Sequence, residues 1–230
     1  MRNHIGLSIY LFYSRIIHFL LGKERVKEWV ELGFWKFKKI KEKELTNYHY
    51  EYFFTDFFNF KKSDYNNKKV LDIGCGPRGS LEWAENAALR VGLDTLADKY
   101  LKLGADKHQM QYANAGAEKI PFPSNHFDVI SSFNSLDHVE DLEKVISEIK
   151  RVLAPNGVFL LITDIHETPT ICEPSSFSWD IVERFAPELR AAEEQHFEGN
   201  KLYRSIRKGI SFNHLDTSKR YGILTVKLCK

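Results

Sequence analysis

Short apolar runs alternate with helical patterns from residue 70 to the end of the chain. Residues 70–73 are apolar and β-branched at both ends, interrupted only by Asp72, which is typical of a short buried strand. Similar runs predict further strands at 90–94, 110–113, 126–133, 158–163, 189–197 and 221–228. Apolar positions at helical spacing predict helices at 80–89, 95–103, 142–153 and 176–185. Strands that alternate with helices in this way are typical of an α/β sheet with mostly parallel strands.

Three glycines follow the first predicted strand. Gly74, Gly76 and Gly79 separate it from the helix expected at 80–89, and strand, glycine turn and helix form the nucleotide-binding turn of a doubly wound sheet. The spacing also fits a dinucleotide site. However, Asp72 would repel a pyrophosphate, and Pro77 removes one backbone N–H from the turn. A ligand with a cationic head therefore suits this turn better.

A second acidic residue lies at the end of the next predicted strand. Asp94 follows Asp72 by about twenty residues, the separation at which an acid binds the ribose hydroxyls of a nucleotide. The same carboxylate can cap the helix expected at 95–103. The sequence predicts that Asp94 lies beside the glycine turn at one edge of the sheet.

These stretches resemble, in order, the motifs of the class I S-adenosylmethionine-dependent methyltransferases. Residues 70–80 are similar to the first motif, D-x-G-x-G, and residues 92–100 to the second. Residues 116–123 and 127–162 resemble the later motifs, and the N-terminal third matches none. The resemblance, to methyltransferase type 11-like domains, implies a Rossmann-like doubly wound sheet of seven strands. The sheet would be mostly parallel with an antiparallel last strand, and would bind S-adenosyl-L-methionine.

The resemblance also implies which residues contact the methyl donor. They are Asp72, Gly74, Cys75, Gly76, Asp94, Thr95, Ala117, Glu118 and Asn134. The family often carries an aspartate that binds the adenine amino group where this chain has Gly116. Backbone groups of Ala117, or the side chain of Glu118, would then have to recognise the adenine.

Two histidines are candidates for proton transfer. His138 and His166 follow the fourth and fifth predicted strands, at the edge where ligands bind in open α/β folds. A general base is needed only if the acceptor must lose a proton early, as a hydroxyl does. His138 can equally brace the helix that begins nearby, and His166 can be a surface residue. No Cys/His spacing matches a zinc site, so we expect no metal.

Residues 1–66 are expected to form a helical extension before a methyltransferase domain at 67–230. Ile5–Leu21 is almost entirely apolar, but it is short for a membrane span and contains Arg15. We expect a helix that packs on the domain or on a second subunit of a homodimer, and a helix lying in a membrane interface is the alternative. The aromatic residues at 48–60 are expected to pack on the sheet, where a tyrosine could face the donor's sulfonium.

Composition and charge indicate which kinds of partner and which cellular compartment to expect. A net charge of +2 over 230 residues gives no reason to expect a nucleic-acid partner. Three cysteines far apart in the sequence favour a reduced, cytoplasmic setting, with attachment to a membrane surface as the alternative.

Three functions fit the sequence. The first is methyl transfer to oxygen or nitrogen of a small or medium polar acceptor, such as a sugar or glycan precursor. The second is methylation of a lipid or quinone at a membrane. The third is a catalytically silent cofactor-binding protein, which only the missing acid at Gly116 supports.

Overall fold

The computed structural model describes residues 22–47, 50–166, 168–170 and 173–230. The chain divides into two compact units, of which the first ends at Glu44 and the second spans Leu45–Lys230. The helix predicted at 5–21 lies outside the described residues. Among the helices that are described, none is long and apolar enough to cross a membrane.

The described part of the first unit is a single helix, α2 (Lys23–Glu42). Trp29, Phe37 and Ile40 lie at helical spacing and therefore on one side of α2. They expose 68%, 64% and 81% of their surface. Lysines and glutamates are interspersed along the rest of the helix, with Lys39 and Lys41 in its last turn. The helix thus combines an apolar stripe with a charged surface of both signs.

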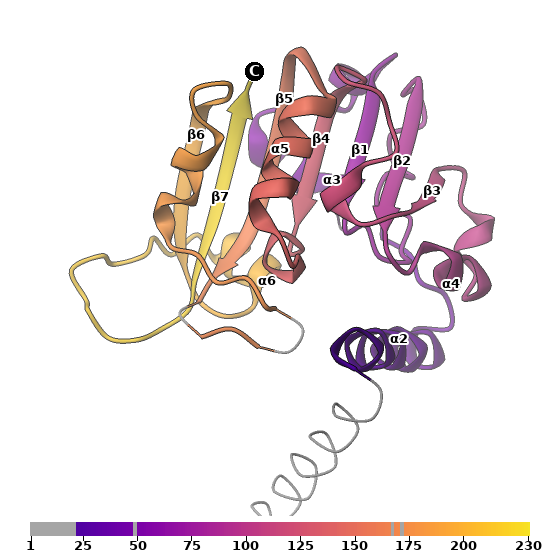
Figure 1. The fold of residues 1–230 in the computed structure, drawn as a ribbon, viewed down its shortest axis with the longest axis horizontal. Helices are drawn as coiled ribbons and strands as arrows, with labels where there is room; N and C mark the ends of the chain where they lie inside the picture. Colours follow the sequence, from indigo (N-terminus) through magenta and orange to yellow (C-terminus); the bar gives the residue numbers. More distant parts are fainter. Residues whose placement is uncertain (1–21, 48–49, 167, 171–172) are drawn as a thin grey trace, which may run out of the picture. The chain divides into compact units, whose positions relative to one another are not determined.

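The second unit is built on a sheet of seven strands in the order β3-β2-β1-β4-β5-β7-β6 (Figure 1). The strands are β1 (Lys69–Ile73), β2 (Leu89–Asp94), β3 (Gln111–Asn114), β4 (Phe127–Phe133), β5 (Leu153–Ile165), β6 (Arg190–Glu198) and β7 (Gly222–Cys229). β1 to β5 run parallel to one another, and β7 is antiparallel to both β5 and β6. The prediction of a doubly wound, mostly parallel sheet with an antiparallel last strand is confirmed.

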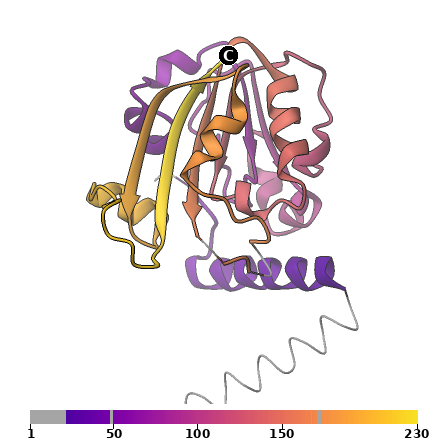
Figure 2. The same cartoon turned by 60° about the vertical axis from the view of Figure 1, so that its left-hand side comes forward.

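Helices cover both faces of this sheet. The α-helices of the second unit are α3 (Glu51–Phe54), α4 (Ala97–Lys102), α5 (Leu142–Val152) and α6 (Leu202–Lys208). The 3-10 helices are η1 (Asp56–Phe58), η2 (Lys62–Tyr65), η3 (Ala105–Lys107), η4 (Ala117–Lys119), η5 (Leu136–His138) and η6 (Trp179–Phe185). α5 and η6 contribute to one hydrophobic core, and α3, η1, η2 and α6 to the other. Figure 2 shows α5 and the segment around α3 on opposite sides of the sheet.

The chain pattern explains the largest elements. β4 and β5 are almost continuously buried, as central parallel strands must be. In α5, Val145, Ile146 and Ile149 recur at helical spacing and are buried against the sheet. Asp141 is the N-cap residue of this helix, and its carboxylate accepts the backbone N–H of Lys144 at 3.1 Å.

Three local predictions differ from the structure. The helix expected at 80–89 is wrong, because residues 80–88 form successive turns, such as that from the Ala84 N–H to the Leu81 carbonyl. The helix expected at 176–185 is a 3-10 helix that begins at Trp179. β5 is longer than predicted and passes through Asn156, which adopts a left-handed conformation with φ 62°.

Candidate active site

The glycine turn between β1 and the segment 80–88 has the backbone that its sequence requires. Gly74 and Gly76 have φ angles of 70° and 58°, in the left-handed region that favours glycine. A Cβ atom at position 74 would lie 2.2 Å from the Cβ of Ser135, which follows β4. The turn is therefore pressed against the end of β4, and no side chain fits at this position.

Asp72 lies inside the sheet directly before this turn. Its side chain is 5% exposed, and Ser131 of β4 donates a 2.6 Å hydrogen bond to its Oδ1. Burial raises the pKa of Asp72 to about 6, against 3.8 for an ordinary aspartate, and the Ser131 hydrogen bond opposes part of this rise. Such a desolvated carboxylate is stabilised by a neighbouring cation.

Cys75 contributes to the turn mainly through its backbone. Its Sγ would lie 2.5 Å from a Cβ atom at Gly92, so the thiol occupies the space that this glycine of β2 leaves open. Burial, followed by the nearby Asp94 and Asp72, raises the pKa of the thiol. The side chain of Cys75 is thus part of the packing between β1 and β2.

Asp94 joins the end of β2 to the glycine turn. Its Oδ2 accepts the backbone N–H of Gly76 at 3.2 Å, and its Oδ1 accepts that of Leu96 at 2.9 Å. Asp94 therefore lies beside the turn, as predicted, but the predicted cap is wrong, because the N-cap residue of α4 is Leu96 and no side chain caps this helix. The binding of ribose hydroxyls by Asp94 stays a prediction. Thr95, the next residue, is exposed at the same edge.

Glu118 occupies the space that a side chain at position 116 would take. A Cβ atom at Gly116 would lie 2.8 Å from Glu118 Oε2 and 3.9 Å from Thr95 Cγ2. Glu118 Oε1 also accepts the backbone N–H of Glu140 at 3.1 Å. The acid that the family often carries at position 116 is absent, but a carboxylate is present in the same region. Ala117, between the two, is buried.

The end of β4 turns sharply beside the glycine turn. Asn134 is exposed in a left-handed conformation with φ 56°, and its backbone N–H donates to the Ile162 carbonyl at 2.7 Å. Ser135 Oγ then donates to the Ile73 carbonyl at 2.7 Å. The chain that leaves β4 is thereby held beside the glycine turn, and it continues into η5, which contains Asp137 and His138.

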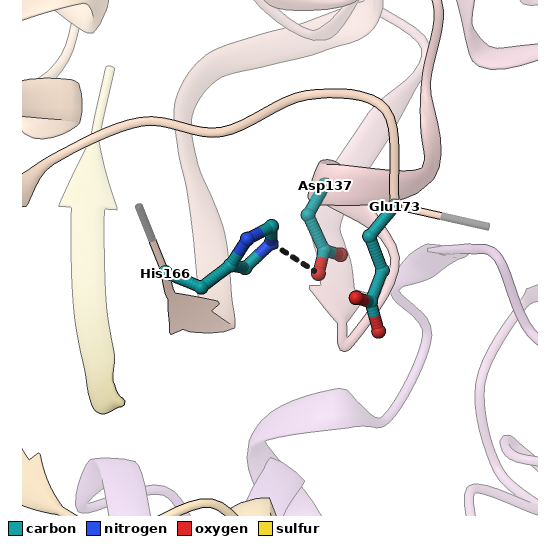
Figure 3. A group of neighbouring side chains, drawn as sticks. All are labelled: Asp137, His166 and Glu173. Atoms are coloured by element: carbon teal, nitrogen blue, oxygen red, sulfur yellow. Dashed lines mark ion pairs between the residues drawn. The ribbon is translucent and has the colours of Figure 1, made fainter. Parts of the chain in front are cut away.

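An acidic cluster surrounds His166 at the same edge of the sheet. Asp137, His166 and Glu173 each offer a ligand atom, and these atoms all lie within 4.8 Å of one another. Figure 3 shows the His166 ring facing the Asp137 carboxylate, with the Glu173 carboxylate beside it; Nε2 lies 3.6 Å from Asp137 Oδ2. His138 lies at the rim, with Nε2 3.8 Å from Asp137 Oδ1.

A further carboxylate belongs to this region. The pKa of Asp164, near the end of β5, is raised to about 7 by burial and then by the charges of Asp137 and Glu173. Burial also raises the pKa of Asp137. The sequence predicted His138 and His166 as site residues. It contained no signal that Glu173 lies beside them, because the loop that carries Glu173 has no periodic pattern.

Aromatic side chains cover the sheet near these groups. Tyr203 of α6 packs 5.1 Å from Tyr50 and 4.7 Å from Phe53, ring centre to ring centre. Burial raises the pKa of Tyr203, and the neighbouring Tyr50 and then the charges of Asp72 and Asp164 add to the rise. The predicted aromatic packing of 48–60 is confirmed for the described residues, whereas the sequence did not reveal that α6 completes this cover.

Residues 45–47 are tied directly to the glycine turn. The Arg78 guanidinium donates a 2.8 Å hydrogen bond to the Thr46 carbonyl, and the Asn47 amide donates to the Gly79 carbonyl. The Gly79 N–H in turn donates to the Tyr112 hydroxyl at 3.1 Å. The turn is thus held by the segment before β1 and by β3.

Part of the second unit matches known proteins. Residues 71–161, which include the glycine turn, Asp94, Asn134 and Asp137, match the family model described as a methyltransferase domain. The fold matches a solved S-adenosylmethionine-dependent methyltransferase from Mesorhizobium loti with a TM-score of 0.54 and 18% identity, covering 72% of this chain and 92% of that one. Residues 71–161 therefore carry a methyltransferase domain, within a unit that has the fold of S-adenosylmethionine-dependent methyltransferases.

Curated relatives of this methyltransferase domain act on varied acceptors. The chain is 34% identical over 123 residues to a ubiquinone/menaquinone biosynthesis C-methyltransferase of Psychromonas ingrahamii, covering 49% of this chain and 48% of the relative. It is 30% identical over 122 residues to a chloroplastic tocopherol O-methyltransferase of Arabidopsis thaliana, covering 49% and 35%. The matched regions thus span half or less of these relatives.

The residues of the glycine turn fit the methyl donor of this family. Gly74 has no side chain to cover its backbone, and Asp72 supplies a buried negative charge beside it. S-adenosylmethionine carries an ammonium and a sulfonium and no phosphate, so it benefits from this charge. A dinucleotide does not, since its pyrophosphate would be placed next to the same carboxylate.

Proposed function

We propose that the protein transfers a methyl group from S-adenosylmethionine to an oxygen or nitrogen of a small or medium polar acceptor. The observation that carries the proposal is the cluster of buried acidic groups next to the glycine turn. Asp137 lies two residues beyond Ser135, which contacts Gly74. The donor turn and the acidic cluster therefore share one edge of the sheet, where ligands of open α/β folds bind.

In this proposal the donor is held by groups that lie at the ends of β1 and β2 or in the segments that follow β1, β2, β3 and β4. Asp72 faces its cationic end, Asp94 binds the ribose hydroxyls, and Glu118 with Ala117 recognises the adenine. The backbone at Gly74, Gly76, Cys75, Thr95 and Asn134 borders the same edge. When bound, the donor supplies an electrophilic methyl group on a sulfonium. The protein's task is then to align the acceptor with that methyl and to exclude water.

The acidic cluster favours a polar acceptor. Asp137 is 1% exposed and His166 is 6% exposed, and Asp164 lies within their electrostatic reach. An apolar acceptor placed here would remove water from carboxylates without replacing their hydrogen bonds, which is costly. A hydroxyl or amine can donate to these oxygens instead, and the Tyr203 ring can pack against its apolar part.

His166 is the better placed of the two candidate bases. The Thr168 carbonyl lies 3.1 Å from its Nδ1, so Nδ1 carries a proton and Nε2 presents its lone pair toward Asp137. Nε2 can then receive a proton from an acceptor hydroxyl, and Asp137 stabilises the imidazolium that forms. His138, which is more exposed, is the second candidate for this role.

A lipid or quinone acceptor is the second candidate function. The exposed apolar stripe of α2, with lysines around it, is the kind of surface that lies in a membrane interface. The relatives described above also include quinone and tocopherol methyltransferases. Residues 5–21 would add to this membrane contact.

Two measurements test the proposal. Thermal-shift titration should show stabilisation by S-adenosylhomocysteine and none by NAD, and the reverse result would refute the donor site. Release of S-adenosylhomocysteine should then be measured with sugars, amines and phenolic quinone precursors as acceptors. Turnover only with quinone precursors would replace the polar acceptor by the lipid-like one, and donor binding without any turnover would favour a silent cofactor-binding protein.

A further inference from the structure

We propose that Asp137, His166 and Glu173 bind a divalent transition-metal cation beside the acceptor. The three side chains come from η5, from the residue after β5 and from the loop that follows it. Their ligand atoms lie within 4.8 Å of one another, close enough for small side-chain movements to place all three around one ion. Two of the three residues are buried, so the cluster differs from the exposed acidic groups that are common on protein surfaces.

The hydrogen bonds of this cluster leave the ligand atoms unused. His166 Nε2 and Asp137 Oδ1 are buried without a hydrogen-bond partner among the described residues, although the two residues are 6% and 1% exposed. Buried polar atoms are normally paired, because an unpaired one loses its hydration without replacement. A cation between them would satisfy both atoms.

The surrounding groups orient the cluster as the outer partners of metal ligands do. His166 Nδ1 lies 3.1 Å from the Thr168 carbonyl, which directs the Nε2 lone pair inward. Glu173 Oε2 accepts the Thr170 hydroxyl at 3.1 Å, leaving Oε1 available. The Ser175 N–H donates to the Asp137 carbonyl at 3.0 Å, so the loop carrying Glu173 is fastened beside η5.

The ligand set indicates the class of cation. One imidazole and two carboxylates suit first-row transition ions such as Zn²⁺ or Mn²⁺, whereas Mg²⁺ and Ca²⁺ prefer oxygen ligands alone. Three protein ligands leave coordination positions open, as in catalytic rather than structural sites. An oxygen of the acceptor or a water can occupy the open position.

This inference deepens the proposed function and rests on it for its chemical role. A cation bound to an acceptor hydroxyl lowers the pKa of that hydroxyl, and the proton passes to solvent. The acceptor oxygen then forms a bond to the methyl carbon while the carbon–sulfur bond breaks and its electron pair remains on sulfur. His166 is a ligand in this state, so its role as proton acceptor applies only without the cation.

Isothermal titration of the full-length, metal-free protein with ZnCl₂ and with MnCl₂, without acceptor, tests the site. We expect one cation per chain, and a dissociation constant that rises more than about tenfold in Glu173→Gln, since losing even an outer partner of a ligand costs that much. Glu173 is half-buried in a loop, so this variant should keep its fold. Retained binding of S-adenosylhomocysteine by Glu173→Gln checks this.

A matched control excludes the other histidine group among the described residues. His196 Nδ1 lies 2.8 Å from His214 Nε2, and Glu194 contacts His196, so this group can also attract Zn²⁺. His214→Gln should leave the titration unchanged. Binding that is lost in His214→Gln and kept in Glu173→Gln would overturn the proposal, as would no binding of either cation. Cation binding by a protein that fails to bind S-adenosylhomocysteine would instead refute the proposed function and leave the metal site standing.

Discussion

Replacing Asp72 by asparagine is expected to stabilise the free protein while weakening donor binding. The folded protein holds the pKa of Asp72 at about 6, and the unfolded chain returns it to 3.8. The two pKa values differ by about 2, and a difference of 1 in pKa corresponds to about 1.4 kcal/mol. The charged form of Asp72 therefore costs the folded state about 3 kcal/mol at pH 8. Asparagine removes this cost and keeps an oxygen to accept the Ser131 hydroxyl.

The sign and the pH range follow from the two pKa values. Below pH 3.8 the carboxyl is mostly protonated in both states, and its ionisation contributes nothing. As pH rises through about 6, the unfolded chain has already lost the proton and the folded protein resists losing it, so stability falls. The advantage of Asp72→Asn in free energy of unfolding should thus grow from about 1.5 kcal/mol at pH 5 to about 3 kcal/mol at pH 8.

Urea denaturation of both proteins at several pH values measures this difference. Comparing the change with pH cancels any constant effect of packing the asparagine amide. Asp98→Asn, at an exposed position, serves as the matched control for the substitution. Calorimetry with S-adenosylhomocysteine should show weaker binding in Asp72→Asn only. A stability difference that does not change between pH 5 and pH 8 would refute the reasoning.

Three further changes test other parts of the structure. Gly74→Ala should lower stability by about 2–5 kcal/mol in urea denaturation, because its Cβ would overlap Ser135 in a left-handed backbone; a normal midpoint would contradict the turn geometry. Asp94→Ala should cost about 1.5–3 kcal/mol of S-adenosylhomocysteine affinity by calorimetry, and unchanged affinity would remove Asp94 from the site. Deleting residues 1–22 should cause aggregation if this segment packs on protein. A truncated protein that stays folded but no longer sediments with anionic liposomes would show that it binds membranes.

Much of the sheet could be predicted because its signals are local. Apolar runs bounded by glycine or acidic residues mark β1 and β2, and side chains at helical spacing mark α5. The helix expected at 80–89 fails because tertiary contacts override the pattern. Glu82 accepts the backbone N–H groups of Gln109 and Met110, and the Trp83 indole donates to the Ser80 carbonyl. These bonds hold the segment in turns.

The candidate site could be predicted only where the chain order determines it. Parallel strands end at the same edge of the sheet, so Asp94, Asn134 and His166 could be placed together in advance. Glu173 could not, because its loop carries no periodic pattern and Ser175 fixes it through a bond to a distant backbone. The Glu118 carboxylate beside Gly116 depends likewise on a side-chain conformation that no spacing encodes.

Two hydrogen bonds between residues 46–47 and the glycine turn bear on the order of substrate binding: Arg78 donates to the Thr46 carbonyl, and Asn47 donates to the Gly79 carbonyl. They fasten the segment before Tyr50 to the turn that we propose receives the donor, and Tyr50 packs on Tyr203 of the aromatic cover. Occupation of the turn would therefore settle the aromatic cover before an acceptor arrives. Steady-state kinetics should accordingly be sequential and ordered, with the donor first. S-adenosylhomocysteine would then inhibit competitively against the donor and noncompetitively against the acceptor.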